Sequence, residues 1–462
     1  MEIPAKLTQG PVLHTLFGLS FPMVGGILSV VGFNLSDTYF VSQLGTKELA
    51  AMSFTFPVVM VLFGVAMGLG TGTTSVVSRA IGRGETSTVR RISSDSLVLS
   101  FLTVLLFAGA GMFTITPLFT LLGATPDVIP LIRQYMMIWY PGIVFLVIPM
   151  IANAAIRAGG DTKIPALIMI GATGTNIILD PILIFGWFGF PRLELQGAAI
   201  ATVISRAGTM VASLLILHYR HRMLDFVTPS LRDVWRSWKS VGVIAVPATI
   251  TNLLQPVALG VVTRLIASYG PGAVGAWGAG SRISVFALVP VFALCSGLVP
   301  FIGQNWGAEQ FDRVARGRKY GYIFAAFWGV LALGILQFMA EPIARLFSND
   351  PDVIREIVRY LWIIPFGYAT VGILSVTEET LNAIGKPVMA SVQTLAHTFV
   401  FTIPFSVVGA HLHAITGLLS GLAAADILGG VVGVSLTRWM CLKGELMCRL
   451  RDAETAAAAA GN

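Results

Sequence analysis

Apolar stretches of about twenty residues or more recur along the whole chain, and short polar segments separate them. An α-helix needs a stretch of this length to cross a bilayer, whereas barrel strands are shorter and alternate between apolar and polar positions. The pattern therefore predicts an all-α polytopic membrane protein with twelve transmembrane helices. The expected spans are Val12–Ser42, Leu49–Ser78, Leu97–Leu121, Val128–Ala155, Ile164–Phe188, Ala198–His218, Val241–Tyr269, Ala273–Ile302, Tyr322–Phe338, Val353–Leu374, Val388–Gly409 and Ile415–Met440.

The two halves of the chain resemble each other at a constant offset of 225 residues. The tripeptide SFP that ends at Pro22 corresponds to AVP that ends at Pro247, and Gly45, Gly82 and Ala158 correspond to Gly270, Gly307 and Ala383. A repeat with an even number of spans predicts two pseudo-symmetric six-helix lobes around a central cavity. The expected division is an N-lobe at residues 1–222, an inter-lobe linker at 223–240, a C-lobe at 241–442 and a tail at 443–462.

The charged residues decide the orientation. Only 11% of the residues are charged and 55% are hydrophobic, which excludes an ordinary soluble domain. The net charge of +7 arises from basic residues that follow every second span, so we expect a membrane protein and no nucleic-acid partner. The positive-inside rule predicts that both termini are cytoplasmic, and the expected location is a bacterial inner membrane. The basic residues expected on the cytoplasmic side include Arg79, Arg83, Arg90, Arg91, Arg157, Lys163, Arg220, Arg236, Arg313, Arg316 and Arg438.

The first span carries a carboxylate, Asp37, with Asn34 three residues before it and therefore on the same helix face. A charged side chain at mid-bilayer depth costs roughly 2.5–3.5 kcal/mol on insertion scales, so such a residue indicates function. The fifth span repeats the theme, because Asn176 and Asp180 are spaced i, i+4. Pro181 follows and frees the carbonyl of Ile177.

Two carboxylates with neutral oxygen donors nearby are typical of a site that takes up one small cation. Thr202 on span six and Asn153 on span four are further candidate donors. Burial and mutual repulsion disfavour the doubly ionised state, which favours uptake of a proton; hard oxygen ligands also suit Na⁺ at Asp37 and Asp180. The alternative is that the two acids only hydrogen-bond neighbouring helices. Pro22, Gly25 and Gly26 form an expected hinge in the first helix.

The C-lobe has a different set of polar residues. Gln255 on span seven, with Glu378 and Glu379 on span ten, forms a possible second polar site, open between structural ion pairs and function. Asp426 is a further acid on span twelve. Some of these acids are expected to pair with Arg206, Arg264 and Arg282, which could instead snorkel from the helix ends. No metal site and no cofactor are expected.

The chain resembles the multidrug and toxic compound extrusion (MATE) family, and within it the DinF-like branch. The resemblance is carried by PMVGGILSVVGFNLSDTYFVSQLG, IRAGGDTKIP, NIILDPILIFG followed by GAAIAT, and GQNWGAEQFDRV. It implies a twelve-helix antiporter that exports cationic and amphipathic compounds in exchange for H⁺ or Na⁺, with Asp37, Asn176, Asp180 and Thr202 at the coupling site. The NorM-like branch also uses C-lobe acids, at positions that fall near Gln255 and Val371 here. Neither is acidic, which favours coupling through the N-lobe alone.

Proton-coupled multidrug efflux is therefore the leading hypothesis, in a monomer that contacts drugs or toxic organic cations and membrane lipid. Na⁺-coupled antiport at the same site is the first alternative. A flippase for lipid-linked precursors is the second, and the scarcity of mid-span basic residues in the N-lobe disfavours it. An intramembrane aspartyl protease is disfavoured because GxGD is absent around both aspartates, so we expect no enzyme activity.

Overall fold

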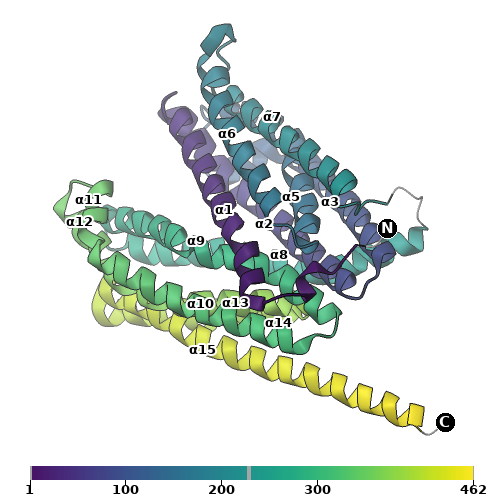
Figure 1. The fold of residues 1–462 in the computed structure, drawn as a ribbon. Helices are drawn as coiled ribbons and strands as arrows, with labels where there is room; N and C mark the ends of the chain where they lie inside the picture. The colour runs from purple at the N-terminus through teal and green to yellow at the C-terminus, as the bar shows by residue number, and fades with distance from the viewer. Residues whose placement is uncertain (1–2, 226–229, 461–462) are drawn as a thin grey trace.

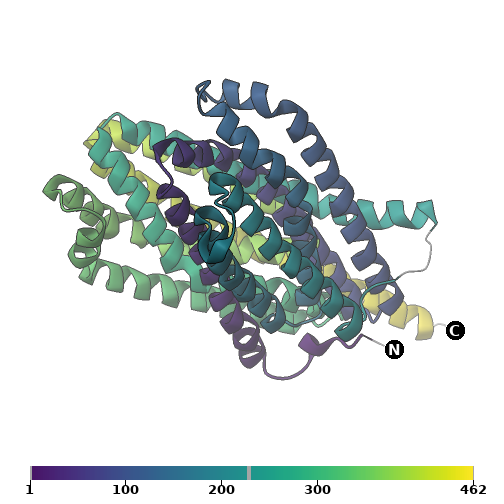
Figure 2. The same ribbon diagram turned by 90° about the horizontal axis from the view of Figure 1, so that it is seen from above.

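The structure is a computed structural model that describes residues 3–225 and 230–460, with the backbone alone for 436–460. Within these residues every regular element is a helix, and eleven helices are long and apolar enough to cross a membrane. The predicted all-α membrane architecture is confirmed. Figure 1 shows two groups of helices that diverge from a common base, and Figure 2 shows the same arrangement from above.

The first group is the N-lobe, which holds six spans. The fourth span is divided near Pro141, as expected where a proline removes a backbone donor. The last span ends in a π-helical turn, η3. The elements are η1 Lys6–Thr8, α1 Val12–Ser42, α2 Thr46–Gly82, α3 Thr86–Leu121, α4 Ile129–Gly142, α5 Val144–Ala158, α6 Lys163–Phe185, η2 Trp187–Gly189, α7 Glu194–Leu215 and η3 Ile216–Arg220.

The second group is the C-lobe. A 3-10 turn that contains Pro365, η4, divides its tenth span into α12 and α13. The short helix α11 was not predicted from the sequence. The elements are α8 Leu231–Ala267, α9 Pro271–Gly307, α10 Phe311–Phe338, α11 Ala340–Phe347, α12 Pro351–Ile363, η4 Ile364–Gly367, α13 Tyr368–Ala383, α14 Pro387–Ala396, η5 His397–Thr402 and α15 Ile403–Ala460.

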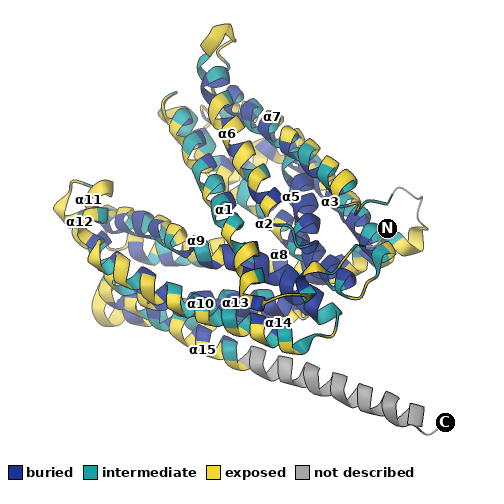
Figure 3. Cartoon of the chain, viewed as in Figure 1, coloured by how far each residue is buried: buried dark blue, intermediate teal, exposed yellow. Residues whose placement is uncertain are grey.

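The last two predicted spans lie within one continuous stretch, Pro387–Ser435. Helical dihedral angles break at His413 and Ala414. On either side of this break, Gly409 packs against the backbone of Gly417, and Gly421 packs against the backbone of Phe405. The chain therefore reverses direction at residue 413, so the stretch supplies two antiparallel crossings and the prediction of twelve spans holds. Figure 3 shows that exposed residues cover much of the outer helix surfaces, as lipid contact requires.

The base joins the lobes through helices α2 and α9, which occupy equivalent places in the repeat. Gly82 packs against the carbonyl oxygen of Gln304, and Gly307 packs against the carbonyl oxygen of Arg79. The two glycines are 225 residues apart in the sequence, and so are the two residues that they contact. The same close contact is thus made twice about the pseudo-two-fold axis, at the ends that carry the basic residues.

Each of these two helices also binds a loop of the opposite lobe. The Gln304 side chain donates from Nε2 to the carbonyl of Ala158 at 2.7 Å, and the Ser75 hydroxyl donates to the carbonyl of Asn382 at 2.6 Å. The two loops turn through glycines at equivalent positions, Gly160 with φ 86° and Gly385 with φ 79°, a left-handed conformation that glycine adopts without steric penalty. At the base, each lobe therefore donates a side-chain hydrogen bond to a loop of the other lobe.

The segment Lys6–Gly10 adds a clasp across this base. Leu7 is buried and donates its backbone N–H to Gln304 Oε1 at 3.0 Å, while its carbonyl accepts from Asn305 Nδ2 at 3.1 Å. The guanidinium of Arg313 donates to the carbonyls of Leu7, Gln9 and Gly10 at 3.2, 3.1 and 2.7 Å. The clasp precedes the N-lobe in sequence but is held by C-lobe side chains.

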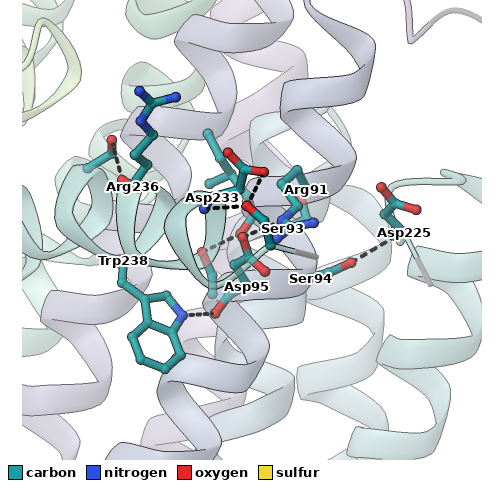
Figure 4. Close-up of polar contacts among 12 residues, drawn as sticks. Arg91, Ser93, Ser94, Asp95, Asp225, Asp233, Arg236 and Trp238 are labelled. Atoms are coloured by element: carbon teal, nitrogen blue, oxygen red, sulfur yellow. Dashed lines mark hydrogen bonds and ion pairs between the residues drawn. The ribbon is translucent and has the colours of Figure 1, made fainter. Parts of the chain in front are cut away.

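The connection between the lobes is also docked at this end. Helix α8 begins at Leu231, inside the expected linker 223–240, because Ser230 caps it by accepting from the Asp233 N–H at 3.2 Å. The Trp238 indole donates to the Asp95 carbonyl at 3.0 Å, and the Asp225 N–H donates to the Ser94 hydroxyl at 2.8 Å (Figure 4). The first turns of α8 and the end of the N-lobe thus bind α3.

Replacing Gly82 by valine should separate the lobes at the base. A Cβ at Gly82 would lie 2.9 Å from the carbonyl carbon of Gln304 and 3.0 Å from the nitrogen of Ala308. Overpacking of this kind typically costs about 1–3 kcal/mol, which shifts a two-state equilibrium by roughly 5–150-fold. Spin labels at the exposed residues Ser87 and Asp312 should report longer distances by double electron–electron resonance.

The matched control is Gly109→Val on α3. No atom lies within 4 Å of a Cβ placed at Gly109, so the distance distribution should stay as in the wild type. If the Gly82→Val protein had the wild-type distance distribution between the spin labels, the glycine contact would not be what holds the lobes together at the base.

Candidate functional site

Asp37 occupies the buried side of α1, in line with Phe33 and Val41 at spacings of four residues. Its side chain is only 5% exposed. The Oδ1 atom is buried and accepts no hydrogen bond. A buried carboxylate without donors is costly while it carries its charge.

The second carboxylate, Asp180, lies on α6 and is fully buried together with Asn176. The Asn176 amide donates from Nδ2 to Asp180 Oδ1 at 3.1 Å, as the i, i+4 spacing predicted. Asp180 Oδ2 and Asn176 Oδ1 are buried and have no partner. Pro181 follows inside the same helix, so its ring nitrogen cannot donate to the carbonyl of Ile177.

The fold brings the two carboxylates together. Asp37 and Asp180 lie close enough to interact electrostatically, and Tyr135 of α4, which is 5% exposed, interacts with both. The hydroxyl of Thr202 on α7 is also buried without a partner. The unpartnered oxygens of Asp37, Asn176 and Asp180 therefore form an environment for a small cation, and Thr202 offers a further unpartnered oxygen on α7.

Two of the predicted donors do not join this group. Asn34 is exposed, and its amide donates to the carbonyl of Val30 at 3.0 Å. Asn34 lies three residues from Asp37, so its side chain lies beside the buried row formed by Phe33, Asp37 and Val41 and is not part of that row. Asn153 is buried but accepts from the Ser213 hydroxyl at 3.3 Å, five residues from the basic end of α5. Asp37 lies five residues from the opposite end of the membrane span, so Asn153 fixes α5 to α7.

The predicted C-lobe residues do not form one site either. Gln255 is exposed on α8, far along that helix from its basic end. Glu378 and Glu379 lie near the basic end of α13, where Glu378 accepts from the Thr394 hydroxyl at 3.4 Å. Glu379 interacts electrostatically with Arg157 at the end of α5 in the other lobe. These two glutamates belong to the base between the lobes.

The partners expected for the C-lobe acids also need correction. Asp426 pairs with His397 at 3.1 Å. Arg206 lies in the N-lobe, on α7, with its guanidinium carbon 4.5 Å from the centroid of the Phe33 ring. It interacts electrostatically with Asp37. Tyr135 was missed because an aromatic residue in an apolar span gives no signal of its neighbours.

The expected hinge residues lie inside one continuous helix. Pro22 is accommodated within α1. Gly26 packs closely on α6, because a Cβ there would lie 3.1 Å from Ala166 Cα and 3.3 Å from Met169 Sδ. A Cβ at Gly25 would meet Ile170 at an ordinary 3.6 Å. Gly26 thus sets the close approach of α1 and α6 in this conformation.

The chemistry available at the N-lobe site is cation uptake by oxygen. The described residues contain no group of three or more His, Cys, Asp or Glu side chains that could hold a metal ion. Protonation of either carboxylate would remove a buried charge and supply a hydroxyl donor for one of the unpartnered oxygens. Na⁺ would instead use the oxygens as ligands.

Two segments of the chain, residues 22–182 and 247–408, match the family model described as MatE. The FAD transporter of Shewanella oneidensis strain MR-1 is 38% identical over 94% of this chain and 96% of its own length. The multidrug export protein MepA of Staphylococcus aureus strain MSSA476 is 26% identical over 91% of this chain and 92% of its own length. The crystal structure of the Vibrio cholerae MATE transporter VcmN in the bent form aligns with a TM-score of 0.90 at 32% identity, over 94% of this chain and 98% of that chain. The two matched segments start 225 residues apart, in agreement with the repeat.

Replacing Asp37 by asparagine should make the protein more stable at pH 8. The amide keeps the shape of the carboxylate while it removes a buried charge and adds a donor, for a gain on the order of 1–3 kcal/mol. The midpoint of thermal unfolding, followed by size-exclusion chromatography with fluorescence detection, should rise. The same change at Asp180 should act in the same direction.

Asp95→Asn is the control with the opposite expectation. Asp95 is also 5% exposed, but it forms an ion pair with Arg91 at 2.7 Å, so neutralising it should lower the midpoint. If Asp37→Asn lowered the midpoint as well, the carboxylate of Asp37 would have satisfied partners and the site as described would be wrong.

Proposed function

Since this chain belongs to the MatE family of membrane transporters and is not an enzyme, we propose that it exports small organic molecules in exchange for protons bound in the N-lobe. The observation that carries the proposal is the buried Asp37 carboxylate, whose Oδ1 has no donor and which interacts electrostatically with a second carboxylate, Asp180. The proposal includes a monomer in a bacterial inner membrane, with both termini cytoplasmic, and membership of the DinF-like branch.

Helix α1 is suited to couple proton binding to movement because it packs on both lobes. In its first half, Leu19 contacts Gly297 of α9, which belongs to the C-lobe. In its second half, the backbone carbonyl of Ser29 accepts from the Thr173 hydroxyl of α6 at 3.0 Å. Protonation of Asp37 removes a charge from between α1 and the N-lobe helices. A new position of α1 would then alter its contact with the other lobe.

The closed base defines the direction of this step. The positive-inside rule supports a cytoplasmic position for the base, so in this proposal the lobes are joined there and diverge toward the outside. We assign this arrangement to the state that releases substrate outward and takes up a proton. The inward-facing state requires the glycine crossing of α2 and α9 and the Lys6–Gly10 clasp to separate.

Proton is favoured over Na⁺ because the two carboxylates are surrounded by apolar helices, where neutralisation requires no ordered ligand shell. A flippase for lipid-linked precursors is less well supported, because cations within the N-lobe spans are few, with Arg206 on α7 among them. Among the substrates, cationic and amphipathic drugs are the family expectation. FAD is a second candidate, favoured by the name of the relative at 38% identity.

Transport in proteoliposomes would test the coupling ion. Efflux of a fluorescent organic substrate should be driven by an imposed pH gradient and not by an imposed Na⁺ gradient. Asp37→Asn should abolish the driven component, since its side chain cannot exchange a proton, while the exposed control Asp352→Asn should not. Transport driven only by Na⁺, or undiminished in Asp37→Asn, would refute the proton-coupled site.

A second experiment tests whether the N-lobe alone couples transport to the proton gradient. Glu379→Gln removes the charge that faces Arg157 across the base, so we expect the rate of transport to change while the dependence on the pH gradient persists. A Glu379→Gln protein that still transports down a substrate gradient but ignores the pH gradient would place the coupling acid in the C-lobe.

A further inference from the structure

Arg206 places a positive charge inside the N-lobe. It lies near the middle of α7, and its guanidinium carbon is 4.5 Å from the centroid of the Phe33 ring on α1. Phe33 is buried, 6% exposed, and lies one turn from Asp37 on the same face. Arg206 therefore points toward α1 within the lobe instead of extending along α7 to the lipid headgroups.

This guanidinium is not satisfied by the protein. Its Nε atom is buried and has no hydrogen-bond partner, and no hydrogen bond or ion pair holds Arg206 anywhere in the described part of the chain. Asp37 acts on it only through space. Contact with an aromatic face compensates a cation in part. An arginine at this depth is expensive, so one without a protein partner indicates a ligand.

The side chain as a whole is half-buried, and only Nε is shut away from the surface. The two outer nitrogens are not among the buried unpartnered atoms, and the guanidinium lies against the Phe33 ring. A planar guanidinium with free N–H donors binds carboxylate and phosphate groups with two parallel hydrogen bonds. Thr202 lies one turn from Arg206 on the same face of α7, and its buried hydroxyl also lacks a partner.

We infer that Arg206 binds an anionic phosphate or carboxylate group of the transported molecule, held in place by Phe33 and with Thr202 as a neighbouring hydroxyl. This inference rests on the proposed export through the N-lobe. It also fits the exchange with protons, because Phe33 and Asp37 share α1. Movement of α1 on protonation of Asp37 would withdraw the ring that positions the guanidinium, and the anion would be released.

A series of flavins separates the anionic group from the rest of the ligand, because riboflavin is neutral whereas FMN and FAD carry phosphate. Binding is measured on the purified full chain by the shift of its thermal unfolding midpoint, in the absence of any ion gradient. Inorganic pyrophosphate serves as the bare anion. We expect FMN, FAD or pyrophosphate to stabilise the wild type, with an apparent affinity at least tenfold higher than in Arg206→Gln.

The controls are Arg206→Lys, which should retain part of the affinity because it keeps the charge, and Arg264→Gln, an exposed arginine of α8, which should leave it unchanged. The apparent affinities of the wild type and Arg206→Gln for riboflavin should agree within twofold, or neither protein should bind it. The inference is overturned if no anion stabilises the wild type more than Arg206→Gln. It is also overturned if Arg206→Gln lowers the apparent affinity for riboflavin as much as that for FMN.

A lipid headgroup carries the same chemistry as a free phosphate, so the measurement is repeated in nanodiscs of phosphatidylcholine with and without phosphatidylglycerol. Stabilisation by phosphatidylglycerol that Arg206→Gln abolishes, without any effect of flavins or pyrophosphate, would assign the anion to lipid. Because no gradient is used, these outcomes are independent of the transport experiment. Failure of proton coupling would leave anion binding intact, and the reverse also holds.

Discussion

A carboxylate buried in a membrane protein must either find hydrogen-bond donors or lose its charge, and Asp37 is in this position. Nothing donates to its buried Oδ1, and the ionisable side chains that interact with it electrostatically include a second acid, Asp180, and an arginine, Arg206. The charge of this one side chain is therefore an electrostatic cost for α1 and the N-lobe helices around it. Helix α1 contacts both α6 and α9, so it packs on both lobes.

The lobes share a scaffold but differ in chemistry. The repeat is seen in the base, where Gly82 and Gly307 make the same contact and Gly160 and Gly385 adopt the same left-handed turn. It is absent at the polar site, because the position equivalent to Asp37 is the buried Val262. The symmetric features serve packing, whereas the Asp37 carboxylate has no counterpart at the equivalent position of the C-lobe.

The base shows how such a protein can close firmly and still open. Its contacts include backbone-to-glycine approaches and single hydrogen bonds from Ser75 and Gln304. Each bond is individually modest, at about 1 kcal/mol net. A closure built from several modest bonds is lost in steps, and the clasp at Lys6–Gly10 adds to it from the C-lobe side chains.

The sequence by itself determined the membrane class, the number of spans, the repeat and the two acidic helices. The repeat follows from comparing the two halves of the chain, and the other features follow from periodicity and composition within one segment. This is why α1 has the bounds predicted for it, Val12–Ser42. Asn176 and Asp180 also meet as predicted, because their spacing lies within one helix.

The tertiary structure decided which helices meet and how each is rotated about its axis. Helical spacing placed Asn34 near Asp37 but could not show that the buried stripe excludes it. Depth along separate helices removed Asn153 from the site, and the packing of α7 on α1 brought Arg206 to Phe33 and Asp37 instead of to the C-lobe acids. These relations depend on contacts between segments far apart in the chain, which no local pattern specifies.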